Sequence, residues 1–485
     1  MKVFSVMFLA ALTSVAAAQP AARPAPAPAV PATTPAAPSP TPSGPAASPI
    51  PSGAPGTTAP GGATPAAPGG PNPAVPTSST GGEILTLERA LEIAMKQQPN
   101  LRIGRAQVES AAGRVDQARV ALLPTLDVDA TLGAHSRGNG PFFTHQESTG
   151  LGASASWLIT DFGRTSLAIR AAELNADATA AGLSTTTLDV RTGVETSYLE
   201  AVARRRLVQV AEATVKSEDS HLDQARRFVA AGAKDPIEVA QAQSRDANAK
   251  SALAQAQSNE AIALANLRSA IGWVEPDHAP VVSANFPAPS EADPPALATL
   301  VDTARKQRPE IVQLDKLLQA ADANVSAAHA ERRPTLSAQA EAQWGPQSGD
   351  WSPEPSWSAT LALRWRLFDG GQSAADVRIA NANMTVASAQ RDALLVSLTS
   401  QLDSSRSQIV ADRANVQAST EAVTAARAQL QLAEARYAQG LGSQIELADA
   451  QTAVTTAEGN LVTADFQLAT AWAQLRRQTA QEVTK

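Results

Sequence analysis

Two patterns typical of different kinds of structure meet end to end in residues 357–437. In residues 357–368 apolar and polar residues alternate, which is typical of a β-strand with one apolar and one polar face. After Asp369-Gly370-Gly371, neither glycine nor proline occurs again before Gly440, so we expect one helix about 100 Å long. Within it an apolar residue stands at every seventh position: Leu395, Leu402, Ile409, Val416, Val423, Leu430 and Tyr437. This spacing predicts a coiled coil, joined directly to a strand of the membrane type.

The same order of patterns occurs twice. Pro124-Thr125-Leu126 returns as Pro334-Thr335-Leu336, and Asp161 and Gly163 return as Asp369 and Gly371. We interpret this as the duplication of one unit. The first repeat spans residues 83–271 and the second residues 296–478, with a proline-rich linker at residues 272–295. The predicted strands are residues 124–134, 150–160, 334–344 and 356–368, and the predicted long helix hairpins are residues 164–271 and 371–478.

The two ends of the chain differ from this pattern. Residues 1–18 carry Lys2, a short apolar run and three alanines, which predicts a secretory signal peptide, because the run is too short to span a bilayer as a helix. Residues 19–82 are rich in proline, alanine and glycine with one charged residue, Arg23, and we expect a disordered tether. Residues 479–485 are predicted to be a disordered tail.

Composition argues against several classes of function. The chain has no cysteine, which excludes disulfides, cysteine-bound metals and thiol catalysis. The net charge is −7 without a basic patch, so nucleic-acid binding has no support. The sequence holds no phosphate-binding loop or nucleophile arrangement, and we expect no enzyme, no cofactor and no metal. The histidines are scattered, and we expect them all on the surface: His135, His145, His221, His278 and His329.

Four strands cannot close a barrel. Each has about the length that crosses an outer membrane at a tilt, and unpaired strand edges in lipid cost several kcal/mol per backbone group. Copies of the chain would complete the sheet, two giving eight strands and three giving twelve. Because the second face carries Asp127, Asp129, Glu341, Arg364 and Arg366, we expect a wet interior, which favours three copies or more. The alternative is a soluble pair of hairpins lying on a coiled coil.

Several motifs together resemble the outer membrane efflux protein family, the TolC-like export ducts, over residues 83–478. They are the two Pro-Thr-Leu motifs, the joints Asp161-Phe162-Gly163 and Leu367-Phe368-Asp369-Gly370-Gly371, and the segment Arg436-Tyr437-Ala438-Gln439-Gly440-Leu441-Gly442-Ser443-Gln444-Ile445-Glu446-Leu447-Ala448-Asp449-Ala450-Gln451. The resemblance implies an α+β membrane protein: a homotrimeric 12-stranded transmembrane β-barrel, four strands per protomer, continued by a long periplasmic α-helical coiled-coil barrel. It also implies an outer-membrane exit duct of a tripartite efflux or type I secretion system, passive and gated at its periplasmic end. The implied partners are outer-membrane lipid, a periplasmic adaptor protein and, through it, an inner-membrane pump.

The resemblance also assigns roles to the tips of the helix hairpins. Residues expected to dock the adaptor are Gly440, Leu441, Gly442 and Ser443, with Ala231, Gly232 and Ala233 at the first tip, which departs from the Gly-Leu pattern. The expected gate consists of Glu446 and Asp449, which would form a ring of six carboxylates in a trimer, and of Tyr437 and Glu238, which would link the two hairpins. Gly442 stands where some relatives have a second, arginine link. The simpler alternatives are chain reversal at the glycines and acids placed at a helix N-terminus.

Two rival functions remain open on the sequence alone. A secreted structural or adhesive coiled-coil protein would share the long helices, and a general diffusion porin would share the strands. Dependence on detergent separates the first from a duct, and the resting conductance in a bilayer separates the second.

Overall fold

The structure, a computed structural model, describes residues 84–138, 143–274, 281–286, 293–346 and 353–481. They all belong to one compact unit, residues 79–485. The predicted signal peptide and tether lie outside the described residues, as do parts of the predicted linker and tail. In the part of the chain that is described, no helix has both the length and the hydropathy of a membrane span.

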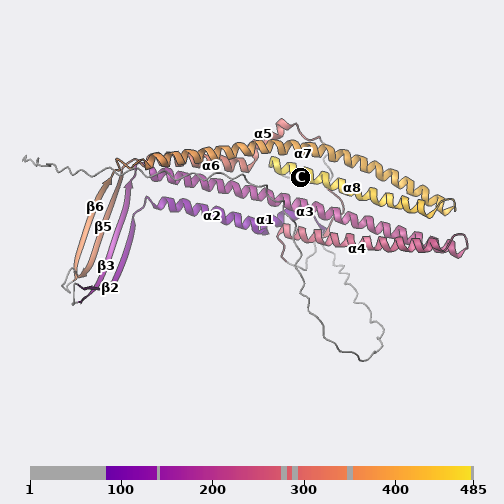
Figure 1. Ribbon diagram of the computed structural model, residues 1–485, viewed down its shortest axis with the longest axis horizontal. Coiled ribbons are helices and arrows are strands. Elements are labelled where there is room, and N and C mark those ends of the chain that lie inside the picture. Colours follow the sequence, from indigo (N-terminus) through magenta and orange to yellow (C-terminus); the bar gives the residue numbers. More distant parts are fainter. Residues whose placement is uncertain (1–83, 139–142, 275–280, 287–292, 347–352, 482–485) are drawn as a thin grey trace, which may run out of the picture. The chain divides into compact units, whose positions relative to one another are not determined.

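Long helices make up most of this unit (Figure 1). The chain runs through α1 (Leu87–Gln97), α2 (Pro99–Val120), α3 (Arg164–Ala230) and α4 (Ile237–Ile271), then α5 (Leu297–Gln307), α6 (Pro309–Ala330), α7 (Gln372–Ala438) and α8 (Gln444–Thr479). α3 and α7 have 67 residues each. α3 packs along α2, α4, α6 and α8, and α7 along α6 and α8. Two helix hairpins, α3–α4 and α7–α8, therefore lie against each other.

The seven-residue spacing on α7 marks its packed face, as predicted. Leu402, Ile409, Val423 and Tyr437 are buried, and the other three members are partly buried. Leu402 and Ile409 share a core with Leu468 of α8, and Val423 packs with Val454 of the same helix. α8 is thus the coiled-coil partner of α7.

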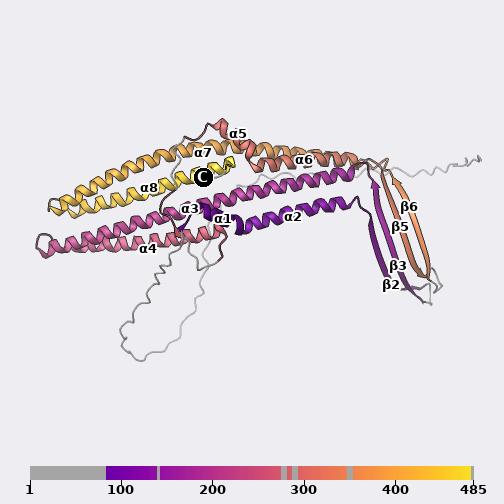
Figure 2. The same cartoon turned by 180° about the vertical axis from the view of Figure 1, so that it is seen from behind.

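Four antiparallel strands form one sheet in the order β2 (Thr125–Gly138), β3 (Phe143–Thr160), β5 (Thr335–Pro346) and β6 (Pro353–Arg364), side by side in Figure 2. One face carries exposed apolar side chains, among them Val128 and Leu361. On the other face Asp127, Ser154, Glu341 and Ser358 stand in one register row across the four strands. β2 and β6 are the edges of this sheet, so the sheet is open at both sides.

The strands β3 and β6 are each joined to a long helix by a tight turn with an aspartate cap. Asp369 accepts hydrogen bonds from the backbone N–H groups of Gly371 and Ser373, both at 2.9 Å, and from the Ser373 hydroxyl. These bonds, that of the hydroxyl foremost, lower the pKa of Asp369 to about 2. Gly371 has φ +96°, a conformation that favours glycine. The cap keeps its charge at any physiological pH and fixes where α7 begins.

Several predicted boundaries differ from the structure. β6 ends at Arg364 rather than at about residue 368, and the indole of the next residue, Trp365, donates to the Arg332 carbonyl oxygen at 3.1 Å. All four strands extend beyond the predicted segments at the ends where β2 is followed by β3 and β5 by β6. Thr479, assigned to the disordered tail, is the buried last residue of α8.

The proline-rich linker contains a short strand that the sequence did not indicate. Val281–Val282 forms β4, which pairs in parallel with β1 (Ile84–Leu85). Leu85 and Val282 are buried in a core with Tyr198 of α3, whose hydroxyl donates to the Leu85 carbonyl oxygen at 3.1 Å. This short pair anchors the segments that precede α1 and follow α4 to the middle of α3.

Candidate functional site

The two hairpins are tied together near their tips through one residue, Glu238. The Tyr437 hydroxyl of α7 donates to the Glu238 carboxylate of α4 at 3.0 Å. The side-chain amide of Gln444, at the start of α8, donates to the Glu238 backbone carbonyl oxygen at 2.9 Å. The structure thus brings together the two predicted link residues, and Gln444 adds a second bond between the hairpins that the sequence did not indicate.

Tyr437 is the most enclosed of these groups, with 1% of its surface exposed. The Phe228 ring meets it edge to face, with centroids 5.7 Å apart. The Lys234 ammonium lies 5.3 Å from the Tyr437 ring centroid and 3.5 Å from the Glu238 carboxylate. Burial first, and then the hydrogen bond to Glu238 and its charge, raise the pKa of Tyr437 to about 12. The tyrosine therefore stays protonated, and able to donate, at every physiological pH.

Backbone geometry explains much of the tip sequence. Gly440 and Gly232 have φ +74° and +69°, and the next residues, Leu441 and Ala233, donate back to carbonyl oxygens of the preceding helix. This is the glycine-terminated helix end. Ser443 caps α8 by accepting from the Glu446 backbone N–H at 3.1 Å. Several predicted docking residues therefore have a structural role of their own.

Two further tip residues bear on the predicted docking and gate. A Cβ at Gly442 would lie 3.0 Å from the Tyr437 backbone nitrogen, so an arginine there could not fit unless the turn shifted. Leu441 is 71% exposed, and Ala231, Gly232 and Ala233 are exposed at the first tip. Leu441 and Ile445, which is also exposed, are thus large apolar side chains that the second tip presents.

We expect Gly440→Ala to destabilise the protein by about 1–2 kcal/mol, because alanine must adopt the left-handed conformation there. Thermal unfolding in detergent, followed by circular dichroism, measures the effect as a lower melting temperature. The matched control is Gly113→Ala in α2, where a Cβ meets nothing within 4 Å and the backbone is helical; it should be neutral or slightly stabilising. Equal melting temperatures for the two variants would contradict the role assigned to Gly440.

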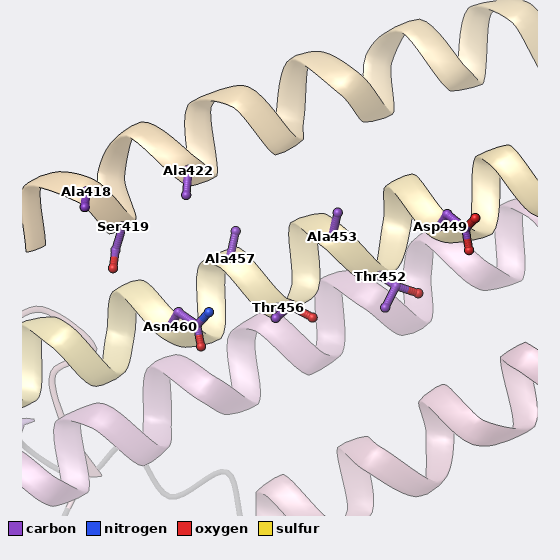
Figure 3. Close-up of a pocket in the computed structure, with 9 residues that line it drawn as sticks. All are labelled: Ala418, Ser419, Ala422, Asp449, Thr452, Ala453, Thr456, Ala457 and Asn460. Atoms are coloured by element: carbon purple, nitrogen blue, oxygen red, sulfur yellow. The ribbon is translucent and has the colours of Figure 1, made fainter. Parts of the chain in front are cut away.

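The two predicted gate acids are not equivalent. Glu446 lies 3.5 Å from the Arg436 guanidinium, whereas Asp449 is exposed and forms no ion pair with the described residues. Asp449 stands at one end of a groove of about 560 Å³ between α7 and α8 (Figure 3). The groove is lined by small and neutral polar side chains: Ala418, Ser419, Ala422, Thr452, Ala453, Thr456, Ala457 and Asn460. Asp449 is the one charged side chain among the residues that line this groove.

Further from the tips, the contact between α3 and α8 is polar. The Ser217 hydroxyl donates to Gln451 at 2.8 Å, the Thr214 and Thr455 hydroxyls are 3.0 Å apart, and Arg206 pairs with Asp465 at 2.8 Å. We call this contact the α3–α8 seam. Its residues are 234 to 259 positions apart in the chain, so no local pattern pointed to it. Across the described residues, no group of three or more histidine or acidic side chains could hold a metal ion.

The comparisons with known proteins agree with this architecture. A family model described as outer membrane efflux protein matches residues 90–273 and 300–481. Protein CyaE of Bordetella pertussis is 30% identical over 59% of this chain, and the pyoverdine export outer membrane protein OpmQ of Pseudomonas aeruginosa is 28% identical over 60%. The match spans 61% and 63% of the lengths of these relatives. The Campylobacter jejuni CmeC outer membrane channel has the same fold, with a TM-score of 0.70 and 17% identity over 81% of this chain and 85% of CmeC.

Proposed function

Because this chain belongs to the outer membrane efflux protein family, an outer-membrane family with large periplasmic helical parts, we propose that it is the passive exit duct of a tripartite efflux or type I secretion system. In this proposal three copies form the duct. Their strands make a 12-stranded barrel across the outer membrane, and their helix hairpins make a tunnel through the periplasm. The two similar halves of each chain arise by internal duplication.

The observation that carries the proposal is the open sheet. Its apolar face is exposed along the length of a membrane-crossing strand, and its edge strands β2 and β6 have free backbone groups on their outer sides. Lipid does not satisfy such groups, so strands of neighbouring copies have to pair there. The row of Asp127 and Glu341 on the opposite face fits a water-filled interior, which eight strands would be too few to enclose.

The tip contacts support a gate at the periplasmic end. The Tyr437–Glu238 and Gln444–Glu238 bonds hold the two hairpins together, and we take this as the closed state. Opening then separates the hairpins and breaks these bonds. The exposed Leu441 supports docking of the periplasmic adaptor at the second tip, and through the adaptor an inner-membrane pump supplies the energy.

Purification and bilayer recording test the proposal. The full chain should require detergent, chemical cross-linking should end at the trimer, and the trimer should conduct weakly at rest because the gate is closed. A monomer that is soluble without detergent would favour a secreted coiled-coil protein instead. A wide and steady conductance in the unmodified protein would favour a general diffusion porin.

A further inference from the structure

His221 of α3 is buried, contrary to the expectation that all histidines lie on the surface. It is 8% exposed, whereas His329 of α6 is exposed as predicted; the side chains of His135, His145 and His278 lie outside the described part. His221 Nε2 is 3.1 Å from the Ser217 hydroxyl, and that hydroxyl donates to Gln451 of α8. A short chain of hydrogen bonds therefore leads from the imidazole across the α3–α8 seam.

This arrangement fixes where the imidazole carries its proton. The Ser217 hydroxyl has one hydrogen, which it gives to the Gln451 side-chain oxygen, so its oxygen accepts from His221 Nε2. The neutral imidazole thus has its hydrogen on Nε2 and its free lone pair on Nδ1. A second proton adds at Nδ1 and places a charge inside the seam.

The surroundings of His221 favour the neutral form. Burial lowers its pKa, Glu434 of α7 opposes the shift, and Arg245 of α4 adds to it. Arg245 also lies 3.4 Å from the Glu218 carboxylate, whose own pKa burial raises. With Gln451 on α8, these are the groups that face the imidazole from the elements around it. The Glu434 carboxylate and the Arg245 guanidinium act on the pKa of His221 in opposite directions, and burial is the largest cause. Burying a charged imidazolium is therefore costly.

We propose that His221 makes the α3–α8 seam responsive to pH, an inference that rests on the proposed gated duct. Protonation of His221 then separates the hairpins and favours the open channel. The part of the seam next to His221 suits this role because a hydrogen bond between two neutral side chains, Ser217 and Gln451, holds it, and water competes for such a bond. Ser217 and Gln451 lie within about four helical turns of the tips. A charged imidazole gains hydration when the seam opens, and the tip bonds open with it.

The direction follows from the sign of the pKa shift. The closed seam holds His221 with a lowered pKa, whereas the open seam lets it return toward its ordinary value of 6.5. Above pH 6.5 the histidine is neutral in both states, so the closed state keeps its stability. As the pH falls below 6.5, the closed state loses stability relative to the open state. Since one proton is taken up per protomer, the opening equilibrium changes by up to about tenfold per pH unit for each protomer.

Bilayer recordings of the trimer between about pH 8 and about pH 5, a range that brackets imidazole titration, test the idea with two variants. His221→Gln keeps a donor toward Ser217 but cannot be charged, and it should stay at the low conductance throughout. The ordinary pKa of a lysine, about 10.4, lies above this whole range, so His221→Lys is charged throughout in the open seam, and its conductance at neutral pH should equal that of the parent in acid. His329→Gln is the matched control and should keep the parental response.

The outcomes separate this inference from the proposed function. Trimers that conduct, but respond to pH equally in the parent and in His221→Gln, would overturn the role of His221 and leave the duct intact. A parent trimer whose conductance does not rise in acid would do the same. Material that forms no trimer and no channel at any pH would overturn the proposed function itself.

Discussion

Tyr437→Phe should raise the resting conductance of the trimer strongly. It removes the hydroxyl that donates to Glu238 but leaves the ring packed against Phe228. A hydrogen bond to a charged acceptor contributes about 1.5–3 kcal/mol net, so its loss shifts the opening equilibrium by about ten- to a hundredfold per protomer. Single-channel recording in a planar bilayer measures the shift as a larger or more frequently open conductance.

The chain offers a matched control, because it has two tyrosines. Tyr198→Phe removes a hydroxyl that donates to the Leu85 carbonyl oxygen, a contact within the first half of the chain rather than between hairpins, and it should leave the conductance unchanged. Glu238→Ala, which removes the acceptor, completes a double-mutant cycle: its effect and that of Tyr437→Phe should not add, since the two residues share one bond. A parental conductance in Tyr437→Phe, or equal effects of both tyrosine variants, would refute the link.

Features that depend on local periodicity were predictable from the sequence. The burial of Leu402 and Ile409 follows from the seven-residue spacing, and the exposed apolar side chain of Leu361 follows from alternation along β6. Both patterns reflect the fixed geometry of a helix and of a strand.

Features that depend on distant partners were not predictable. The strand in the linker depends on the pairing of Val282 with Leu85, and the bond from Trp365 to Arg332 joins residues 33 positions apart. The burial of His221 results from α3 lying between other helices, which no pattern around residue 221 could indicate. Tyr437 and Glu238 were paired through the family resemblance rather than through any spacing between them, because they are 199 positions apart.

The two gate acids should differ in their effect on ion selectivity. In a trimer Asp449 places three charges on the face of the α7–α8 hairpin that we propose lines the tunnel, and it has no cationic partner among the described residues. The charge of Glu446 is partly offset by Arg436 at 3.5 Å. We therefore expect Asp449→Asn to lower the preference for cations severalfold, and Glu446→Gln to lower it less, since rings of carboxylates attract cations at a constriction.

The reversal potential under a potassium chloride gradient measures this preference directly. Glu458→Gln is the matched control, because it removes one carboxylate from the same helix nine positions away, about 180° around α8 at about 100° per residue, where it pairs with Arg427 at 2.6 Å. Its reversal potential should equal that of the parent. Since Tyr437→Phe acts on closure and Asp449→Asn on charge, the first should change how much current passes and the second which ions carry it. If Asp449→Asn and Glu458→Gln shifted the reversal potential equally, the cation preference would come from the total charge of the chain, and Asp449 would have no special place in the gate.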